Sequence, residues 1–163
     1  MKIEWTEEHV VFSEIDDFML DVLQKIPLNA AALDDKVISR IYPTLTDGVD
    51  EDADEDWREH VMPGLSELFQ THMDVVIKDL KQIEKEGDEK EGEISTLTFP
   101  ASHVRSWMHT LNQARLALGA LHDVTEDDIE GRKKDHAGEK SFALFQIEIY
   151  GLILSLMLQH TEL

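Results

Sequence analysis

The chain has 163 residues, of which 42% are hydrophobic, 31% are charged and none is cysteine. This composition is ordinary for a soluble globular protein, and we expect residues 1–163 to fold as a single helical domain whose core needs no disulfide or metal. Aspartate and glutamate outnumber lysine and arginine by 35 to 15, so the formal net charge is −20. A field of that sign repels nucleic acid and anionic membranes, which argues against both as partners.

Two further exclusions concern chemistry and location. Without cysteine the chain has no thiol nucleophile, thiolate zinc site or iron–sulfur cluster. Residues 1–8 become acidic where a signal peptide would carry basic residues and an apolar stretch, so we expect a cytoplasmic location. The apolar residues 142–158 are fewer than the about 20 that a membrane span needs, and they include Gln146 and Glu148. We interpret this stretch as a buried helix.

The N-terminal region predicts a short strand followed by a helix. Residues 2–5 alternate between polar and apolar side chains, which is typical of a strand. Thr6 is placed to cap a helix over residues 7–26, where apolar side chains recur at helical spacing. Pro27 lies where this helix would have to end.

Acidic residues dominate the next segment. Asp34 is placed to cap a short helix that ends before Tyr42. Residues 47–56 are predicted to form an acidic, solvated loop that includes a turn at Asp47. This loop is expected to lead into a helix near Trp57.

A long helix and a small β element are predicted in the middle of the chain. Helical periodicity continues from Leu65 to residue 85 or 86, with a kink or restart at Pro63. Residues 87–93 form a charged linker bracketed by glycines. Residues 94–98 have the alternation of a short strand, and we expect them to pair with residues 2–5 in a two-stranded ribbon.

The C-terminal third predicts further helices. Pro100 is placed in the first turn of one of them, and Thr125 with Asp128 resembles a capping box for a short one. Residues 132–139 are polar and are expected to form a mobile loop. The last helix, over residues 139–160, is apolar nearly all round, so we expect it to be central or to lie at a subunit interface. The predicted fold class is therefore mainly α, a helical bundle with a minor ribbon.

No motif of established chemistry stands out. None of the eight histidines follows a carboxylate by three residues, as a ferritin-type metal site requires. Asp50, Asp52 and Asp54 resemble the start of a calcium loop, but Glu55 stands where that loop needs glycine. His72 lies on the apolar stripe of its helix, and we interpret it as a core histidine with one hydrogen bond. We predict no cofactor, no metal and no catalytic residues, and we favour a non-enzymatic role.

The most informative polar side chains lie within apolar helices. Asn112 and Arg115 stand three positions apart on one helix face, and Glu148 is the one carboxylate between residues 139 and 162. Because an unpaired charge in a core costs about 3–5 kcal/mol, we predict that Arg115 pairs with Glu148 or with a carboxylate of the first helix. We favour a structural tie between helices over a ligand-binding pocket.

One segment resembles a known family. Residues 107–119 read WMHTLNQARLALG, which resembles the W-x3-LN-x2-RLALG signature of a bacterial family known as domain of unknown function 2017. Residues 40–43 and 56–58 are similar to its R-[LI]-[FY]-P and E-F-R segments, and residues 145–158 are similar to its last helix. The resemblance implies a helical single domain with no established activity. Members are often encoded beside a Clp protease adaptor, so the resemblance also implies an association with regulated proteolysis.

Two functions of different classes remain open. The first is a non-enzymatic interaction or regulatory protein whose acidic surface attracts a basic protein partner, such as a Clp protease component, and whose last helix supports a homodimer. The alternative is a small-molecule-binding helical domain, or an enzyme without a recognisable motif, with a pocket near Arg115. A DNA mimic would need carboxylates spaced like phosphates on one face, which a charge total does not show. The possible structural or binding cluster consists of Tyr42, Arg58, Trp107, Asn112, Arg115 and Glu148.

Overall fold

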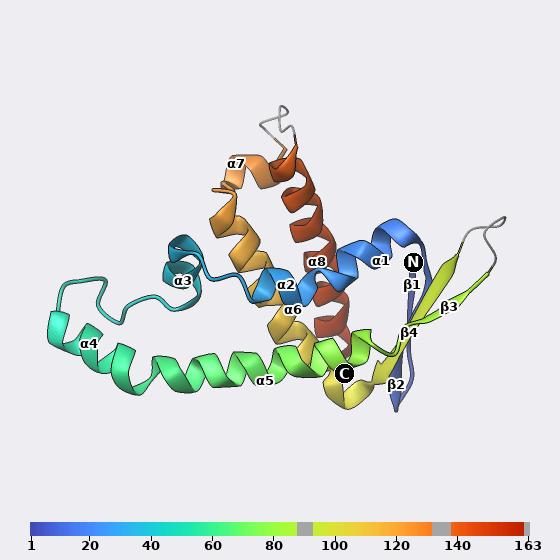
Figure 1. Cartoon of the computed structure of the whole chain (residues 1–163), viewed down its shortest axis with the longest axis horizontal. Coiled ribbons are helices and arrows are strands. Elements are labelled where there is room, and N and C mark those ends of the chain that lie inside the picture. The colour runs from blue at the N-terminus through green and yellow to red at the C-terminus, as the bar shows by residue number, and fades with distance from the viewer. Residues whose placement is uncertain (88–92, 132–137, 162–163) are drawn as a thin grey trace.

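A small antiparallel sheet forms one end of the molecule, and helices form the rest (Figure 1). The computed structural model describes residues 1–87, 93–131 and 138–161. Most of these residues are helical, so the predicted mainly α fold with a minor β element is confirmed. The predicted linker over residues 87–93 and the predicted loop over residues 132–139 lie largely outside the described residues.

The sheet has four strands within the described residues, in the order β1-β2-β4-β3. Neighbouring strands are antiparallel. The strands are β1 (Lys2–Trp5), β2 (His9–Ile15), β3 (Glu84–Glu86) and β4 (Ile94–Pro100). Residues 2–5 and 94–98 are both in strands, as predicted, but they do not pair with each other because β2 lies between them. β2 can occupy this position because its Val10, Phe12 and Ile15 side chains are fully buried.

The predicted helix over residues 7–26 is wrong in its first half. The chain forms β2 there, and the helices begin only with α1 (Asp17–Gln24) and the short α2 (Ile26–Ala30). Thr6 caps no helix, because it closes the turn between β1 and β2, where its Oγ1 accepts a hydrogen bond of 2.9 Å from the amide of His9. Buried Val10 and Phe12 alternate with partly exposed residues, as a strand with one face in the core requires, and an irregularity after Phe12 brings Ile15 to the same face.

The acidic segment is more helical than predicted. α3 (Asp35–Ile41) begins after Asp34, whose side chain accepts a hydrogen bond from an amide in the first turn, and it ends before Tyr42 as predicted. The predicted loop over residues 47–56 is a loop only as far as Asp50, which caps α4 (Glu51–His60). Carboxylates in the first turn of α4 interact favourably with the positive end of the helix dipole, so the acidic run itself favours a helix.

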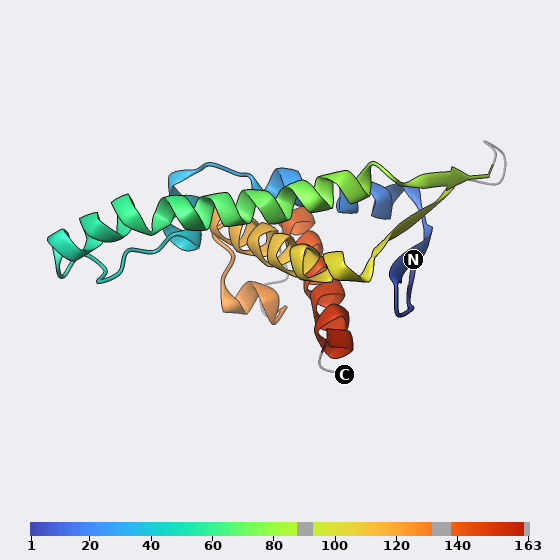
Figure 2. The same cartoon turned by 90° about the horizontal axis from the view of Figure 1, so that it is seen from below.

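α5 (Met62–Leu80) is the predicted long helix, and Pro63 lies in its first turn, where the helix restarts after α4. The helix ends at Leu80 and not at residue 85 or 86, because residues 84–86 pair with β4 as strand β3. Figures 1 and 2 show α4 and the beginning of α5 projecting beyond the other elements. We call residues 43–68, which include these two segments and the loop before them, the acidic arm.

α6 (Val104–Leu121) is the central helix and contacts α2, α3, α5 and α8. Figure 1 shows α5 crossing it at a steep angle. The chain enters α6 through a short 3-10 turn, η1 (Ala101–His103), so Pro100 ends β4 and does not open the helix as predicted. Trp107 of α6 is fully buried and stacks on Phe99 of β4 with ring centroids 4.7 Å apart. α6 therefore joins the sheet to the helices.

The last two helices pack beside α6. α7 (Glu126–Ile129) has the predicted capping box formed by Thr125 and Asp128. α8 (Glu139–Thr161) contacts α6 through one side, where Tyr150 is fully buried. Burial raises the pKa of the Tyr150 hydroxyl to about 12.

The other side of α8 is open to solvent. Leu152 is 57% exposed and Leu158 is exposed as well. Among the described residues α8 is the one helix long and apolar enough to cross a membrane, with a mean hydropathy of 1.8. A core helix of a soluble protein has the same length and composition, so a single helix of this kind is weak support for a membrane span. The fold is compatible with a soluble protein.

Candidate functional site

Two of the predicted site residues, Asn112 and Arg115, line the same hollow beside α6. Its volume is about 580 Å³, which falls within the range of about 300–1,000 Å³ that small-molecule sites occupy. We call it the Arg115 pocket. It is lined by Arg40, Asn112, Arg115, Leu116, Gly119, Ala120, Asp123, Val124, Ile129 and Ile147. α3, α6, α7 and α8 therefore all contribute to its walls.

The guanidinium of Arg115 has no partner among the described residues. Its Nε is buried and makes no hydrogen bond, and no ion pair reaches the side chain within that part of the chain. The predicted pairing with Glu148 or with a carboxylate of the first helix is therefore wrong. The guanidinium instead lies against Gly151 of α8, where an added Cβ would stand 3.4 Å from Nε. The missing side chain at Gly151 leaves room for it.

Glu148 borders a second hollow, of about 330 Å³, which Arg115 also lines. Arg115, Ile129 and Ile147 line both hollows, so the two hollows adjoin each other at these residues. The Glu148 side chain is exposed, and water solvates its charge. This explains why Glu148 needs no arginine partner.

Both aspartates that line the two hollows are bound to lysines. Lys36 Nζ donates to the two carboxylate oxygens of Asp123 at 2.8 and 2.6 Å, and these contacts hold the pKa of Asp123 below its ordinary value. Asp128 accepts a hydrogen bond of 2.8 Å from the amide of Thr125, and Lys140 Nζ lies 3.0 Å from the same carboxylate. The amide of Thr125 and then Lys140 hold the pKa of Asp128 well below its usual range.

Trp107 belongs to the core and not to the pocket. Its indole Nε1 donates a hydrogen bond of 2.8 Å to Oδ2 of the buried Asp79 in α5. His103 Nδ1 lies 2.9 Å from Oδ1 of the same carboxylate. The sequence reasoning missed Asp79, although an acidic side chain three residues after Val76 on an apolar helix face was a signal for it.

His72 and His109 form a second polar contact between α5 and α6. Their rings stack with centroids 4.4 Å apart, and His72 Nδ1 lies 3.1 Å from Ser106 Oγ. Burial, and then the charges of His109 and Arg105, lower the pKa of His72. Among the described residues no group of three or more histidine, aspartate or glutamate side chains could hold a metal ion.

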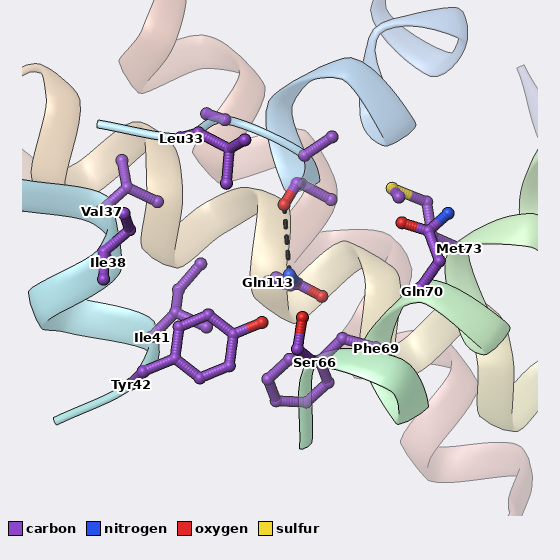
Figure 3. Close-up of a pocket in the computed structure, with 13 residues that line it drawn as sticks. Leu33, Val37, Ile38, Ile41, Tyr42, Ser66, Phe69, Gln70, Met73 and Gln113 are labelled. Atoms are coloured by element: carbon purple, nitrogen blue, oxygen red, sulfur yellow. Dashed lines mark hydrogen bonds between the residues drawn. The ribbon is translucent and has the colours of Figure 1, made fainter. Parts of the chain in front are cut away.

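Tyr42 lies in a different place, an apolar pocket between α3 and α5 that Figure 3 shows. The pocket has a volume of about 330 Å³. Tyr42 faces Phe69 of α5 across it, with ring centroids 5.7 Å apart. At its base Gln113 of α6 donates a hydrogen bond of 3.1 Å to the carbonyl of Ala30. We call this pocket the α3–α5 groove; its other lining residues include Leu33, Val37, Ile38, Ile41, Ser66, Gln70 and Met73.

Arg58 lies in the acidic arm and lines neither the Arg115 pocket nor the α3–α5 groove. Its Nε donates a hydrogen bond of 3.2 Å to the carbonyl of Asp54 within α4. The buried Asp54 side chain accepts hydrogen bonds from the amides of Thr46 and Gly48 at 2.7 and 2.9 Å. Above all the amide of Thr46 lowers the pKa of Asp54. Asp54, a member of the acidic run, thus holds the loop that precedes α4. The sequence did not single out Asp54 for this role.

The structure therefore divides the six predicted site residues into separate groups. Asn112, Arg115 and Glu148 lie around the two hollows beside α6, whereas the other three lie in the core, the groove and the arm. The fold and these sites define a mainly helical protein with a small antiparallel sheet and, among the described residues, at least three surface hollows of ligand size. The family described as domain of unknown function (DUF2017) matches residues 6–159, and the chain belongs to that family, so the resemblance seen in the sequence is confirmed. No curated protein and no solved structure matches the chain.

Proposed function

We propose that this protein is a non-enzymatic, cytoplasmic interaction module that binds a basic protein partner through the α3–α5 groove and the acidic arm. The observation that supports it best is the groove itself, which is apolar and open and adjoins the most acidic part of the chain. Leu33 on its rim is 87% exposed. An open apolar site rimmed by charges is typical of a protein-binding surface.

The acidic arm supports a basic partner. Residues 43–68 contain nine aspartates and glutamates and one arginine, so they carry −8 of the net charge of −20 in 26 of 163 residues. Leu45, Val49, Val61 and Leu68 of the same segment are exposed. The expected partner segment therefore has one or more large apolar side chains flanked by lysine or arginine, because complementary charges raise the association rate and fix the orientation.

The structure of the arm supports the same proposal. α4 makes its main contacts with α5 alone, and the one fully buried residue within it is Asp54. Most helices of a globular protein are stabilised by packing an apolar face on the core, and α4 buries no apolar side chain in this way. Its exposed carboxylates and neighbouring apolar side chains are then available to a partner.

The proposal can be tested by affinity capture of the tagged protein from lysate of its host, in parallel with two variants. Leu33→Glu places a charge on the rim of the groove, and Ile94→Glu places the same charge at an exposed apolar residue of β4, outside the groove. We expect a protein that the wild type and Ile94→Glu capture, that Leu33→Glu does not capture, and that higher salt releases. Capture that is equal for both variants, or no specific capture, would contradict the proposal.

A Clp protease component is the first partner that we propose to test by name. The support is the implied association of the family with regulated proteolysis, and a basic surface on that component is what the acidic arm requires. A purified Clp adaptor or ATPase should bind the wild type in a salt-sensitive manner and should bind Leu33→Glu more weakly. Binding that is indifferent to salt and to Leu33→Glu would exclude this use of the arm.

A homodimer through α8 is also proposed. The exposed Leu152 and Leu158 on the outer side of this helix support it. Light scattering coupled to gel filtration should then give a mass near twice 18.7 kDa for the wild type and a lower mass for Leu152→Glu. A monomer at all accessible concentrations would contradict the dimer and leave the groove proposal intact.

A second candidate function is a small-molecule-binding domain, and the observation that favours it is the unpartnered guanidinium of Arg115 beside a pocket of ligand size. This function is compatible with the first because the Arg115 pocket and the α3–α5 groove share no lining residue. A thermal-shift screen of small metabolites, in the wild type and in Arg115→Met, tests it.

A further inference from the structure

We infer that the Arg115 pocket binds a small organic monoanion, with a carboxylate at one end and a short apolar body. This inference rests on the second candidate function and specifies its ligand. It is independent of the α3–α5 groove.

The first argument for an anionic ligand is the unpaired guanidinium of Arg115. Arg115 is half-buried, its Nε is buried without an acceptor, and its side chain lines the pocket. A chain with 35 carboxylates could have supplied a partner, yet none forms an ion pair with Arg115 within the described residues. A guanidinium binds carboxylates in bidentate geometry, so a ligand carboxylate is the group that would complete this site.

The charges around the pocket give the second step. Its charged lining residues are Arg40, Arg115 and Asp123, and both oxygens of Asp123 are bound by Lys36. The lining is therefore net positive by one charge in a protein of net charge −20. Glu148 borders only the neighbouring hollow. A ligand with one negative charge would therefore neutralise the charge of this lining.

The walls of the pocket give the third step. Leu116, Val124, Ile129 and Ile147 supply apolar surface in the same pocket as the polar side chains. A carboxylate attached to a short hydrocarbon body would place each part against matching surface. An inorganic anion would leave these apolar walls in water, so it fits the pocket less well.

The test uses hexanoate, with 1-hexanol and acetate as comparisons, titrated into the full-length protein while the Arg side-chain Nε–H signals are followed by NMR. We expect hexanoate to bind at least about tenfold more tightly than either comparison. The signal of Arg115 should move with the same saturation curve. Equal binding of 1-hexanol would overturn the anion inference while keeping the pocket, and no saturable binding of any probe in the millimolar range would overturn the second candidate function as well.

Variants locate the binding. Arg115→Met should reduce hexanoate affinity to that of 1-hexanol, whereas Arg105→Met removes an exposed arginine of the same helix outside the pocket and should change nothing. Ile129 is 67% exposed, so Ile129→Glu and Ile129→Gln are expected to fold and to differ only in charge. Ile129→Glu should weaken hexanoate binding several-fold relative to Ile129→Gln. Equal affinities in these two variants, or unchanged binding in Arg115→Met, would contradict the inference.

Discussion

The indole Nε1 of Trp107 donates a hydrogen bond to Oδ2 of Asp79 across 2.8 Å, and both side chains are buried between α5 and α6. His103 approaches the other oxygen of the same carboxylate. α5 continues from the acidic arm, and α6 is the central helix. This contact therefore joins the C-terminal end of α5 to the central helix.

Replacing Asp79 tests this role directly. Asp79→Ala leaves the buried indole N–H without an acceptor, and we expect it to lower the free energy of unfolding by about 2 kcal/mol. Asp79→Asn keeps an acceptor and should cost less. Urea denaturation measures both, with Asp74→Ala at an exposed position of the same helix as the control. A loss no larger than that of the control would show that the hydrogen bond does not stabilise the fold.

His72 should make stability depend on pH. Its pKa is lowered below 6.5 in the folded protein, so the unfolded chain binds the proton more readily. Stability from this group is present above about pH 6.5 and is lost as the pH falls toward the lowered pKa. We expect His72→Gln, which stays neutral and can still bond to Ser106, to lose less stability than the wild type between about pH 7 and about pH 5. Equal losses would rule out His72 as the source.

Asp54 should control the arm locally and not the whole fold. Asp54→Ala removes the acceptor of the Thr46 and Gly48 amides, so these amides should exchange their hydrogens faster. Amides of the buried core in α6 should keep their protection, because α4 contacts mainly α5. Glu55→Ala, at an exposed position of the same helix, is the matched control. A global loss of protection in Asp54→Ala would contradict this account.

Arg115→Met should have little effect on stability. The side chain makes no ion pair within the described residues and has a buried Nε without an acceptor, so its removal breaks no internal bond. We expect the free energy of unfolding to change by less than about 1 kcal/mol in either direction. A loss of about 3–5 kcal/mol, as for a broken buried ion pair, would instead support the interpretation of Arg115 as a structural tie between helices.

Helical periodicity predicted the fold well wherever the apolar stripe packs on a neighbouring helix. α3, α5, α6 and α8 all occur near their predicted positions. The failure at residues 7–26 has a physical cause: β2 forms its second ladder with β4, 80 or more residues away, and local spacing carries no information on that pairing. Glu14 adopts a positive φ of 53° where the pairing of β2 and β4 is irregular, and this departure from regular strand geometry is equally invisible in the sequence.

The site was predictable in part. Asn112 and Arg115 are three positions apart in a helix, so their meeting at one pocket follows from helix geometry. The predicted pairing of Arg115 with a carboxylate was wrong, because helix geometry does not say which residue of α8 lies opposite the arginine. That residue is Gly151. Ile129 of α7 lines both hollows, and its place depends on the capping contacts that hold that short helix. Tyr42 immediately precedes the arm and lines the α3–α5 groove, whereas Arg58 belongs to the arm and binds a carbonyl within α4.

The most direct measurement for the central proposal is amide hydrogen exchange of the full-length protein, free and bound to the partner that the wild type captures. We expect new protection at α3 and at the first half of α5, where the α3–α5 groove lies, and along the acidic arm. Protection confined to α8 or to the sheet, with exchange at α3 and α5 unchanged, would contradict it.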